Sequence, residues 1–311
     1  MQVKILGSAA GGGFPQWNCA CWNCARLRAG TFRGSARTQA QIAVRATGRP
    51  WCLLNASPDL RSQILSDADF APRESPRSSP IAAVVLTGAD VDQITGLLHL
   101  REFQPLRIYA TAPVLKILRE NSIFRALEQT PNQAQWCVLA AETRLELQAP
   151  DGSGLGVAIV PLALGGASPA YERHAGHLST HSQDAVVGLF VESRAGDTLH
   201  RIFCAPSLPR IEEEWLAEWD RCDAIMIDGT FWSDDELKRT RGEGKTAREM
   251  GHIPISGRDG TIEALAKLKR ARKIFYHINN TNPILDEEST ERAQATAAGW
   301  EIAYDGMELT L

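Results

Sequence analysis

The chain has 311 residues and a formal net charge of −4 at pH 7, and 44% of its residues are hydrophobic and 23% are charged. These values are typical of a globular protein, and they exclude a collagen-like, coiled-coil or wholly disordered chain. The weak negative charge supplies no basic surface for nucleic acid or anionic lipid, so we expect small molecules or proteins as partners.

Short β-branched runs alternate with helical patterns along the whole length, which is typical of an α/β domain. The sequence predicts strands at residues 3–6, 41–44, 51–54, 81–86, 107–109, 157–160, 185–192, 201–204, 224–227 and 273–276. It predicts helices at residues 60–65, 95–102, 112–120, 212–221, 261–269 and 286–298. The first of these helices follows a capping residue, Ser57, and Pro58 suits its first turn. No linker or internal repeat interrupts the pattern, so we expect one domain over residues 1–311.

The sequence predicts a cytoplasmic protein. No apolar run approaches the roughly 18 residues that a membrane span requires, and residues 1–7 lack the apolar core of a signal peptide. Seven cysteines are an odd number, and three of them lie too close together for a disulfide framework.

These three cysteines, Cys19, Cys21 and Cys24, lie within six positions. Thiolates this close together can turn inward around one soft tetrahedral ion, with each sulfur about 2.3 Å from a zinc. The alternative is a set of ordinary buried cysteines, although clustered thiols without a metal are prone to oxidation. We therefore expect a structural zinc, with His252 or a group near Asn280 as its fourth ligand.

Acidic residues and a histidine follow three of the predicted strands. Asp90 and Asp92 come after the fourth strand, Asp228 after the ninth and His277 after the tenth. Ligands in open α/β sheets gather at the carboxyl ends of strands. A single aspartate after a strand is more often a turn or capping residue, but three such strand ends together favour a metal or catalytic site.

Three weaker features could contribute to a site. The glycines at 11–13 lack the Lys-Ser/Thr of a phosphate loop, so we expect a backbone that approaches a neighbour closely. His252 lies in a Gly/Pro turn, where a structural histidine is about as common as a functional one. Arg101 and the basic segment 238–248 could pair with substrate carboxylates, although a solvated charged segment is the more common alternative.

The chain resembles a known superfamily. Its segment 86–97 is similar to the His-x-His-x-Asp-His segment of the metallo-β-lactamase superfamily, and Asp228 and His277 fall where that superfamily has its bridging aspartate and last histidine. More narrowly, five separated motifs resemble a family of pyrroloquinoline quinone (PQQ) biosynthesis proteins. These motifs are GGGFPQWNC at 11–19, NASPDLR at 55–61, DGTFW at 228–232, GHIPIS at 251–256 and HINNTNP at 277–283.

The chain departs from the superfamily at its first metal position. Gly88, Asp90 and Gln93 stand where hydrolytic members have histidines, and Asp92 is retained. Many relatives keep a histidine at the position of Gln93. The superfamily's middle histidine would lie in the loop 167–183, where the candidates are His174, His177 and His181.

The resemblance implies a four-layer αββα sandwich, in which two mixed β-sheets lie face to face with helices outside. It also implies an active-site metal held by Asp90, Asp92, Asp228 and His277, with Gln93 as a hydrogen-bonding replacement for a ligand. Three carboxylates and one imidazole are a harder ligand set than a histidine-rich dizinc site, and they suit one iron or manganese ion. We therefore expect Fe(II) at this site and zinc at the cysteines.

The resemblance implies a function as well. The pathway makes an o-quinone from a glutamate–tyrosine cross-linked unit, so it must add oxygen to the tyrosine ring, and a ferrous site can activate dioxygen for that step. We expect an iron- and dioxygen-dependent hydroxylase that acts on this precursor, with other pathway proteins as candidate partners. Two alternatives stay open: a metal-dependent hydrolase, which the lost histidines disfavour, and a carrier for PQQ or its precursor.

Overall fold

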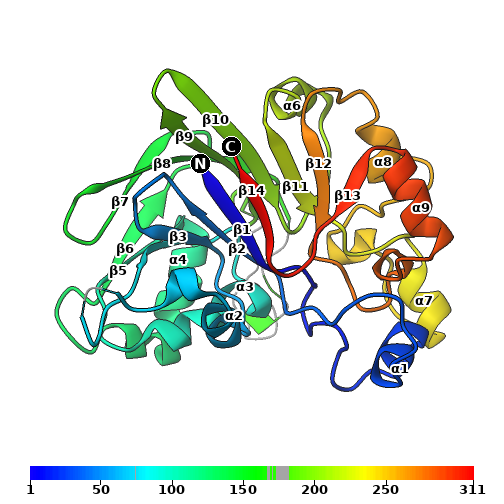
Figure 1. The fold of residues 1–311 in the computed structure, drawn as a ribbon, viewed down its shortest axis with the longest axis horizontal. Helices are drawn as coiled ribbons and strands as arrows, with labels where there is room; N and C mark the ends of the chain where they lie inside the picture. Colours follow the sequence, from blue (N-terminus) through cyan, green and yellow to red (C-terminus); the bar gives the residue numbers. More distant parts are fainter. Residues whose placement is uncertain (74, 167–168, 170, 173–181) are drawn as a thin grey trace. The chain divides into compact units, whose positions relative to one another are not determined.

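Two seven-stranded β-sheets with flanking helices form the framework of the protein (Figure 1). The computed structural model describes residues 1–73, 75–166, 169, 171–172 and 182–311. Their contacts divide them into two compact units. The first comprises Met1–Leu6, Gln41–His200 and Gly306–Leu311, and the second comprises Gly7–Ala40 and Arg201–Asp305. The prediction of a single domain stays a prediction.

The first sheet consists of β1 (Gln2–Gly7), β2 (Gln41–Arg45), β3 (Trp51–Leu54), β4 (Ile81–Val85), β5 (Leu106–Thr111), β6 (Ala134–Leu139) and β14 (Met307–Thr310). Their order across the sheet is β14-β1-β2-β3-β4-β5-β6. β3 to β6 are parallel neighbours, whereas β14 with β1 and β2 with β3 are antiparallel pairs. The sheet is therefore mixed.

The second sheet consists of β7 (Leu145–Gln148), β8 (Gly154–Ala163), β9 (Val187–Ala195), β10 (Thr198–Ala205), β11 (Ala224–Asp228), β12 (Arg272–Tyr276) and β13 (Trp300–Ile302). Their order is β13-β12-β11-β10-β9-β8-β7. β10 to β13 are parallel neighbours, and β7 to β9 are antiparallel. Parallel strands end at the same edge, so β11 and β12 bring the residues that follow them together.

The α-helices in the described part of the chain are α1 (Trp22–Arg28), α2 (Leu60–Ser66), α3 (Val91–Ile94), α4 (Ala112–Glu120), α6 (Glu213–Trp219), α7 (Glu236–Arg241), α8 (Thr261–Ala264) and α9 (Thr290–Ala297). Short 3₁₀ helices are η1 (Ala68–Phe70), η2 (Thr95–Leu100), η3 (Ser122–Leu127), η4 (Arg248–Met250) and η5 (Pro283–Leu285). Among the described residues, no helix combines the length and the apolar character that a membrane span requires.

Large aromatic side chains fill the core of each unit. In the first unit the indole of Trp51 on β3 packs against Phe70, with ring centroids 5.1 Å apart. All four residues of β3 are buried, which explains why its sequence is an uninterrupted apolar run. In the second unit Phe275 of β12 stacks on Trp300 of β13 with ring centroids 3.8 Å apart. The stacking of Phe275 on Trp300 anchors β12, whose end carries His277.

The glycines at 11–13 form the turn that follows β1. Gly13 has a φ of 70°, a left-handed conformation that favours glycine, and a Cβ atom added there would lie 3.3 Å from the carbonyl oxygen of Arg37. The predicted close approach of this backbone to a neighbour is therefore confirmed.

A buried lysine joins three carboxylates in the first unit. The Nζ atom of Lys4 on β1 lies 2.7 Å from Asp67, 3.0 Å from Asp69 and 2.9 Å from Glu308. Glu308 is the register partner of Lys4 on β14. Three acceptors match the three donors of an ammonium group, so its burial is compensated.

We expect Lys4→Met to lower the free energy of unfolding by about 1.5–3 kcal/mol at pH 7, because the three carboxylates would lose the cation that they share, although Asp69 would keep Arg45 and Arg73. Lys4 lowers the pKa of Asp69, so this stabilisation is present above the ordinary carboxylate pKa and is lost as the pH falls through the lowered value. Urea unfolding at pH 7 and pH 2.5 measures the effect. An equal loss at both pH values would contradict the ion-pair explanation, and Lys116→Met on α4 is the exposed control.

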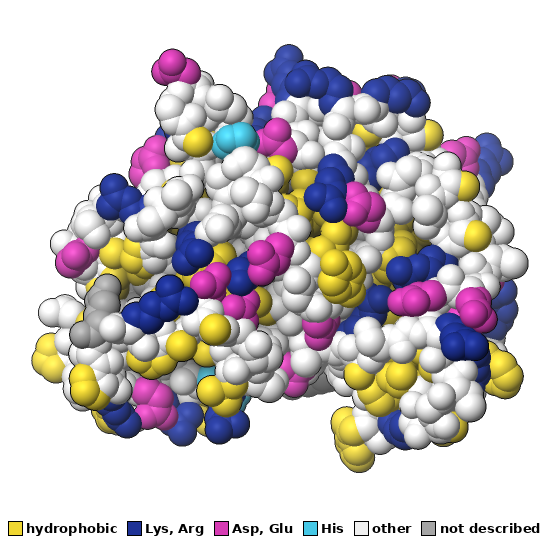
Figure 2. All heavy atoms as spheres, viewed as in Figure 1, with side chains coloured by type: hydrophobic (Ala, Val, Ile, Leu, Met, Phe, Trp, Pro, Cys, Tyr) yellow, Lys and Arg dark blue, Asp and Glu magenta, His cyan; other side chains and the backbone are white. Residues whose placement is uncertain are grey.

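Charged side chains of both signs share the surface. On the face shown in Figure 2, Lys and Arg side chains are interspersed with Asp and Glu side chains. Opposite charges placed near one another screen each other in water, so the field of this face is weak at a distance.

Candidate metal centres

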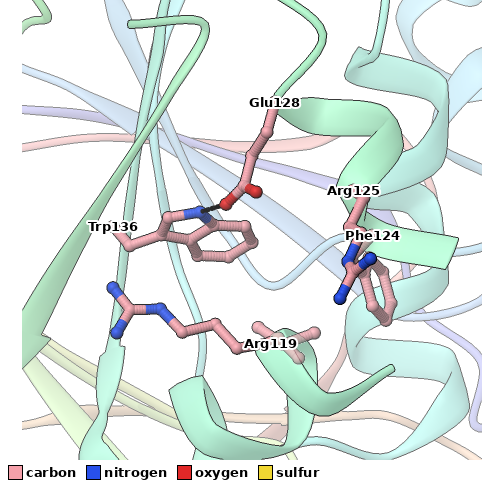
Figure 3. Close-up of a pocket in the computed structure, with 6 residues that line it drawn as sticks. Arg119, Phe124, Arg125, Glu128 and Trp136 are labelled. Atoms are coloured by element: carbon pink, nitrogen blue, oxygen red, sulfur yellow. Dashed lines mark hydrogen bonds between the residues drawn. The ribbon is translucent and has the colours of Figure 1, made fainter. Parts of the chain in front are cut away.

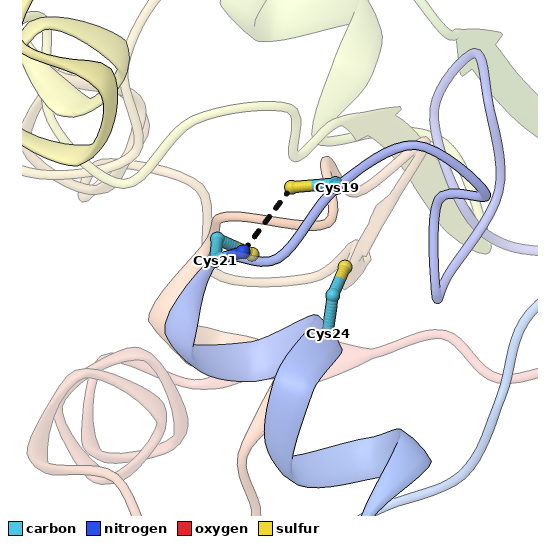
Figure 4. Close-up of side chains that lie close together, drawn as sticks. All are labelled: Cys19, Cys21 and Cys24. Carbon is cyan, nitrogen blue, oxygen red and sulfur yellow. Dashed lines mark hydrogen bonds between the residues drawn. The ribbon is translucent and has the colours of Figure 1, made fainter.

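The three clustered cysteines lie together in the second unit (Figure 4). Cys21 is the residue before α1 and Cys24 lies in the first turn of that helix, so their spacing places both sulfur atoms on one side of it. The three Sγ atoms lie within 4.8 Å of one another. Thiolates around a tetrahedral zinc at about 2.3 Å are roughly 3.8 Å apart, so this cluster fits such an ion with little movement.

Asn280 reaches this cluster from the segment that follows β12. Its Nδ2 atom lies 3.1 Å from the sulfur of Cys19, 3.5 Å from that of Cys21 and 3.3 Å from that of Cys24. The side chain is buried, and its backbone carbonyl accepts a hydrogen bond from Asn23 Nδ2 at 3.1 Å. The carboxamide therefore lies where a fourth ligand would be needed.

The thiols of this cluster influence one another's ionisation. Burial disfavours the charged form of Cys19, but the backbone N–H of Cys21 and the neighbouring amide and thiol groups lower the pKa of Cys19 overall. Burial raises the pKa of Cys21 to about 12, and the neighbouring sulfurs add to this rise. Three thiolates this close repel one another, and a cation between them removes the repulsion.

A second cluster combines one carboxylate and two imidazoles. Asp228 is the last residue of β11, His277 directly follows β12, and His252 lies in the turn after η4. One ligand atom from each of these residues lies within 4.8 Å of the others. Two histidines and one carboxylate are the donor set typical of non-haem Fe(II) centres that react with dioxygen.

Hydrogen bonds hold the carboxylate of this cluster in place. Oδ2 of Asp228 accepts from the backbone N–H of Leu208 at 2.9 Å and lies 2.7 Å from Nδ1 of His252. Oδ1 accepts from the backbone N–H of Thr230 at 3.0 Å and from its hydroxyl at 2.6 Å. Burial alone would raise the pKa of Asp228, but the two histidines and Thr230 lower it overall. The side chain therefore stays ionised although it is 1% exposed.

Thr230 contacts every member of this cluster. Its hydroxyl oxygen lies 2.9 Å from Nδ1 of His277 and 3.2 Å from Nδ1 of His252, in addition to its bond to Asp228. A hydroxyl has one proton, and the 2.6 Å bond to Asp228 uses it, so the imidazole groups approach Thr230 as donors. Protonation at Nδ1 leaves Nε2 of each ring in the acceptor form that binds metals.

One segment contributes to both clusters. His277 takes part in the carboxylate cluster, and Asn280 contacts the cysteines three residues later. Asn282, two residues after Asn280, donates to the carbonyl oxygen of Gly229 at 2.9 Å, and Gly229 precedes Thr230 in the chain. His277 has a φ of 58°, which is rare for a residue with a side chain and costs free energy that the surrounding contacts must supply.

The structure corrects the prediction for His252. The sequence analysis named His252 as one of two candidates for the fourth zinc ligand. In the structure its ring lies with Asp228 and His277 and not with the cysteines. Gly251 has a φ of 86°, which lets the chain turn just before the histidine, and the backbone N–H of His252 donates to Ala247 O at 3.0 Å. The turn fixes the ring against Asp228, a contact that separation along the chain does not reveal.

The predicted ligands of the segment 86–97 lie in the first unit. Asp90 is the residue before α3, and Asp92 and Gln93 lie within that helix. Gln93 is buried, and among the described residues its Oε1 atom has no hydrogen-bond partner. A Cβ atom on Gly88 would lie 2.5 Å from that oxygen, so the glycine makes room for it. The prediction that these residues share a metal with Asp228 and His277 stays a prediction.

An unpartnered buried amide oxygen costs about 1–3 kcal/mol. We therefore expect Gln93→Leu to raise the free energy of unfolding of the metal-free protein by about 1 kcal/mol in urea denaturation. If a bound group satisfies Oε1, metal loading should remove this gain. Gln133→Leu is the matched control, since Oε1 of Gln133 is also buried without a partner in the described part of the chain. If metal loading leaves the gain in the free energy of unfolding equally large in Gln93→Leu and Gln133→Leu, this result would contradict a role for Gln93 toward a bound group.

In the described part of the chain, no hydrogen bond links the predicted basic residues to either metal cluster. Nη1 of Arg101 donates to Leu98 O at 2.7 Å, and Nη2 of Arg248 donates to Asp259 O at 2.9 Å, so both are held locally. Their pairing with substrate carboxylates stays a prediction. The loop histidines lie outside the described residues, namely His174, His177 and His181.

The chain is similar to known proteins in both sequence and structure. A family model described as the beta-lactamase superfamily domain matches residues 50–278. A relative from Nitrosococcus oceani, named coenzyme PQQ synthesis protein B, is 43% identical over 100% of both chains. A relative of the same name from Gluconacetobacter diazotrophicus is 42% identical over 100% of this chain and 99% of the relative. The crystal structure of Zn(2+)-bound PqqB from Methylobacterium extorquens is 40% identical, with a TM-score of 0.90 and full coverage of both chains. The expected fold class, two mixed sheets flanked by helices, is confirmed.

Proposed function

Because the chain belongs to the coenzyme PQQ synthesis protein B family of the metallo-β-lactamase superfamily, and so to PQQ biosynthesis, we propose that it hydroxylates the tyrosyl ring of a glutamate–tyrosine cross-linked precursor. The observation that supports this proposal is the donor set of Asp228, His252 and His277. This set differs from the histidine-rich pairs of dizinc hydrolases. It therefore favours an oxygenase over a hydrolase.

The residues fit a ferrous ion. Asp228 supplies an ionised carboxylate, and the Asp228–Thr230 pair fixes the Nδ1 side of both imidazoles. When bound, ferrous iron supplies the activation of dioxygen that ring hydroxylation requires. We propose that Asp228, His252 and His277 hold this ion.

The protein holds the side chains of the proposed iron site in fixed positions and excludes water from them. Asp228 and His277 are 1% and 6% exposed, so their positions are set by packing and hydrogen bonds before any substrate arrives. Thr230 keeps both rings from rotating, because it bonds to each Nδ1 and to the carboxylate of Asp228. In a rigid, poorly hydrated site, side chains and water molecules need to move less during the reaction.

We further propose that Cys19, Cys21 and Cys24 hold a structural zinc, with Asn280 as the fourth ligand. The two ends of a carboxamide have the same shape, so rotation by half a turn presents Oδ1 to the ion in place of Nδ2. The Methylobacterium extorquens relative is a zinc-bound protein, which supports a zinc in this chain.

The proposed activity is tested by loading the metal-free protein with ferrous iron without air, then adding the cross-linked precursor, dioxygen and a reductant. Mass spectrometry should find a product heavier by one or more oxygen atoms, and zinc-loaded protein should give none. His252→Ala should abolish this product, whereas His99→Ala, at an exposed histidine that contacts Pro58 O, should retain it. Turnover with zinc alone and without oxygen would favour a hydrolase, and binding without turnover would favour a carrier.

A further inference from the structure

A pocket of about 430 Å³ opens in the first unit, within the region formed by α4, η3 and β6 (Figure 3). Its lining residues belong to none of the sequence motifs that contribute to the two metal clusters. They are Leu118, Arg119, Phe124, Arg125, Glu128 and Trp136. The volume lies within the roughly 300–1,000 Å³ typical of small-molecule sites.

Aromatic and aliphatic groups form the apolar part of this pocket. Leu118 and Phe124 are buried in the core of the first unit, and Trp136 is half-buried against the same core. The indole therefore keeps part of its surface available to a ligand. Flat rings stack well on an indole, so this part of the pocket favours an aromatic ligand.

A hydrogen bond fixes the indole. Nε1 of Trp136 donates to Oε1 of Glu128 at 2.6 Å, and Figure 3 shows this bond at one edge of the ring. The carboxylate of Glu128 is thereby engaged with the pocket wall. The ring is held in one orientation, which lowers the entropy lost when a ligand stacks on it.

Two cations border the same space. Figure 3 shows the side chains of Arg119 and Arg125 on different sides of Trp136. In the part of the chain that the structure describes, neither guanidinium has an ion pair or a side-chain hydrogen bond, unlike Arg144 or Arg201, which pair with glutamates. Two unpaired guanidinium groups beside one engaged carboxylate leave a net positive pocket that favours an anion with more than one acidic group.

We propose that this pocket binds a flat aromatic dicarboxylate, with its ring on Trp136 and its two carboxylates paired with Arg119 and Arg125. The inference goes beyond the proposed hydroxylation and does not depend on it, because no residue of the pocket belongs to either metal cluster.

The test uses the full chain and titration calorimetry with benzene-1,3-dicarboxylate. Arg119→Met and Arg125→Met should each weaken binding at least fivefold, because each removes one bidentate carboxylate contact. Lys116→Met is the matched control, since Lys116 is an exposed cation on the same helix α4 but does not line the pocket, and it should bind as the wild type does. Unchanged binding in both arginine variants would overturn the proposal.

Two further ligands separate an aromatic site from a general anion site. Cyclohexane-1,3-dicarboxylate and inorganic phosphate should bind at least fivefold more weakly than the aromatic acid, and Trp136→Leu should remove the preference. Equal affinity for all three ligands would overturn the aromatic assignment. Asp228→Ala should leave the affinity unchanged, so failure of this site and failure of the proposed iron chemistry are distinguishable.

Discussion

Asp228→Ala is expected to abolish binding of the second metal and the hydroxylation, while about one equivalent of zinc stays at the cysteines. The substitution removes the only carboxylate of the described cluster, which accepts four hydrogen bonds: one from Leu208, two from Thr230 and one from His252. Loss of one member of a buried charged network costs about 3–5 kcal/mol, so the variant should also unfold at a lower urea concentration. Plasma mass spectrometry of the purified protein measures both metals.

A loss of stability alone does not explain a loss of iron, and a second, half-buried carboxylate provides the control. Asp305 in the same unit accepts hydrogen bonds from Ser8 and Thr38. Asp305→Ala should destabilise the protein as well but keep its iron. Asp228→Asn preserves the volume and tests the charge itself. An Asp228→Ala protein with full iron content would contradict the assignment.

Cys21→Ser is expected to remove about one equivalent of zinc and to lower the melting temperature by roughly 5–10 °C. Zinc binds the folded arrangement of the three sulfurs, so its binding free energy is also folding free energy. A loss of about 2–3 kcal/mol corresponds to this shift, since 1 kcal/mol moves the melting temperature of a large domain by roughly 2–4 °C. Calorimetry and zinc analysis measure the two effects on the same sample.

Two comparisons make the test of the cysteine cluster specific. Cys137→Ser, at a half-buried cysteine on β6, should keep the zinc. Asn280→Ala should weaken zinc binding, and Asn280→Asp should restore it, because a carboxylate oxygen replaces the carboxamide oxygen. A Cys21→Ser protein that melts like the wild type and never contained zinc would show that the cluster is only part of the core.

The central strands were predictable because burial on both faces gives them an unbroken apolar sequence. The ten predicted strands correspond to β1–β5 and β8–β12. The four strands that the prediction missed, β6, β7, β13 and β14, are the outermost strands of the two sheets. Edge strands are short and partly exposed, so β6, which has one exposed and four half-buried residues, carries little periodic signal.

Helix lengths were less predictable than helix positions. The helix expected at 286–298 begins only at Thr290, because the side chain of Ser289 accepts from the backbone N–H of Arg292 at 3.0 Å and caps it there. The helix expected at 261–269 ends as α8 at Ala264. The helix expected at 95–102 is the 3₁₀ helix η2, preceded by the short α3. Capping contacts of this kind depend on single hydrogen bonds that periodicity does not encode.

The candidate site was predictable where strand order determines it. Asp228 and His277 follow two parallel neighbours, so a strand-end pattern was enough to place them together. His252 lies in a turn that no strand determines, and its place beside Asp228 follows from the contacts of that turn with the backbone of Ala247. Only the nearby Gly/Pro pair pointed to this turn in the sequence.

The central claim is that dioxygen supplies the oxygen that the protein adds to the tyrosine ring, and isotope labelling tests it most directly. Iron-loaded protein is given the cross-linked precursor and a reductant, once under ¹⁸O₂ in ordinary water and once under ordinary dioxygen in H₂¹⁸O. Our account predicts that the heavy isotope enters the product from the gas and not from the water. Label that enters only from water, or a product that forms without dioxygen, would contradict it.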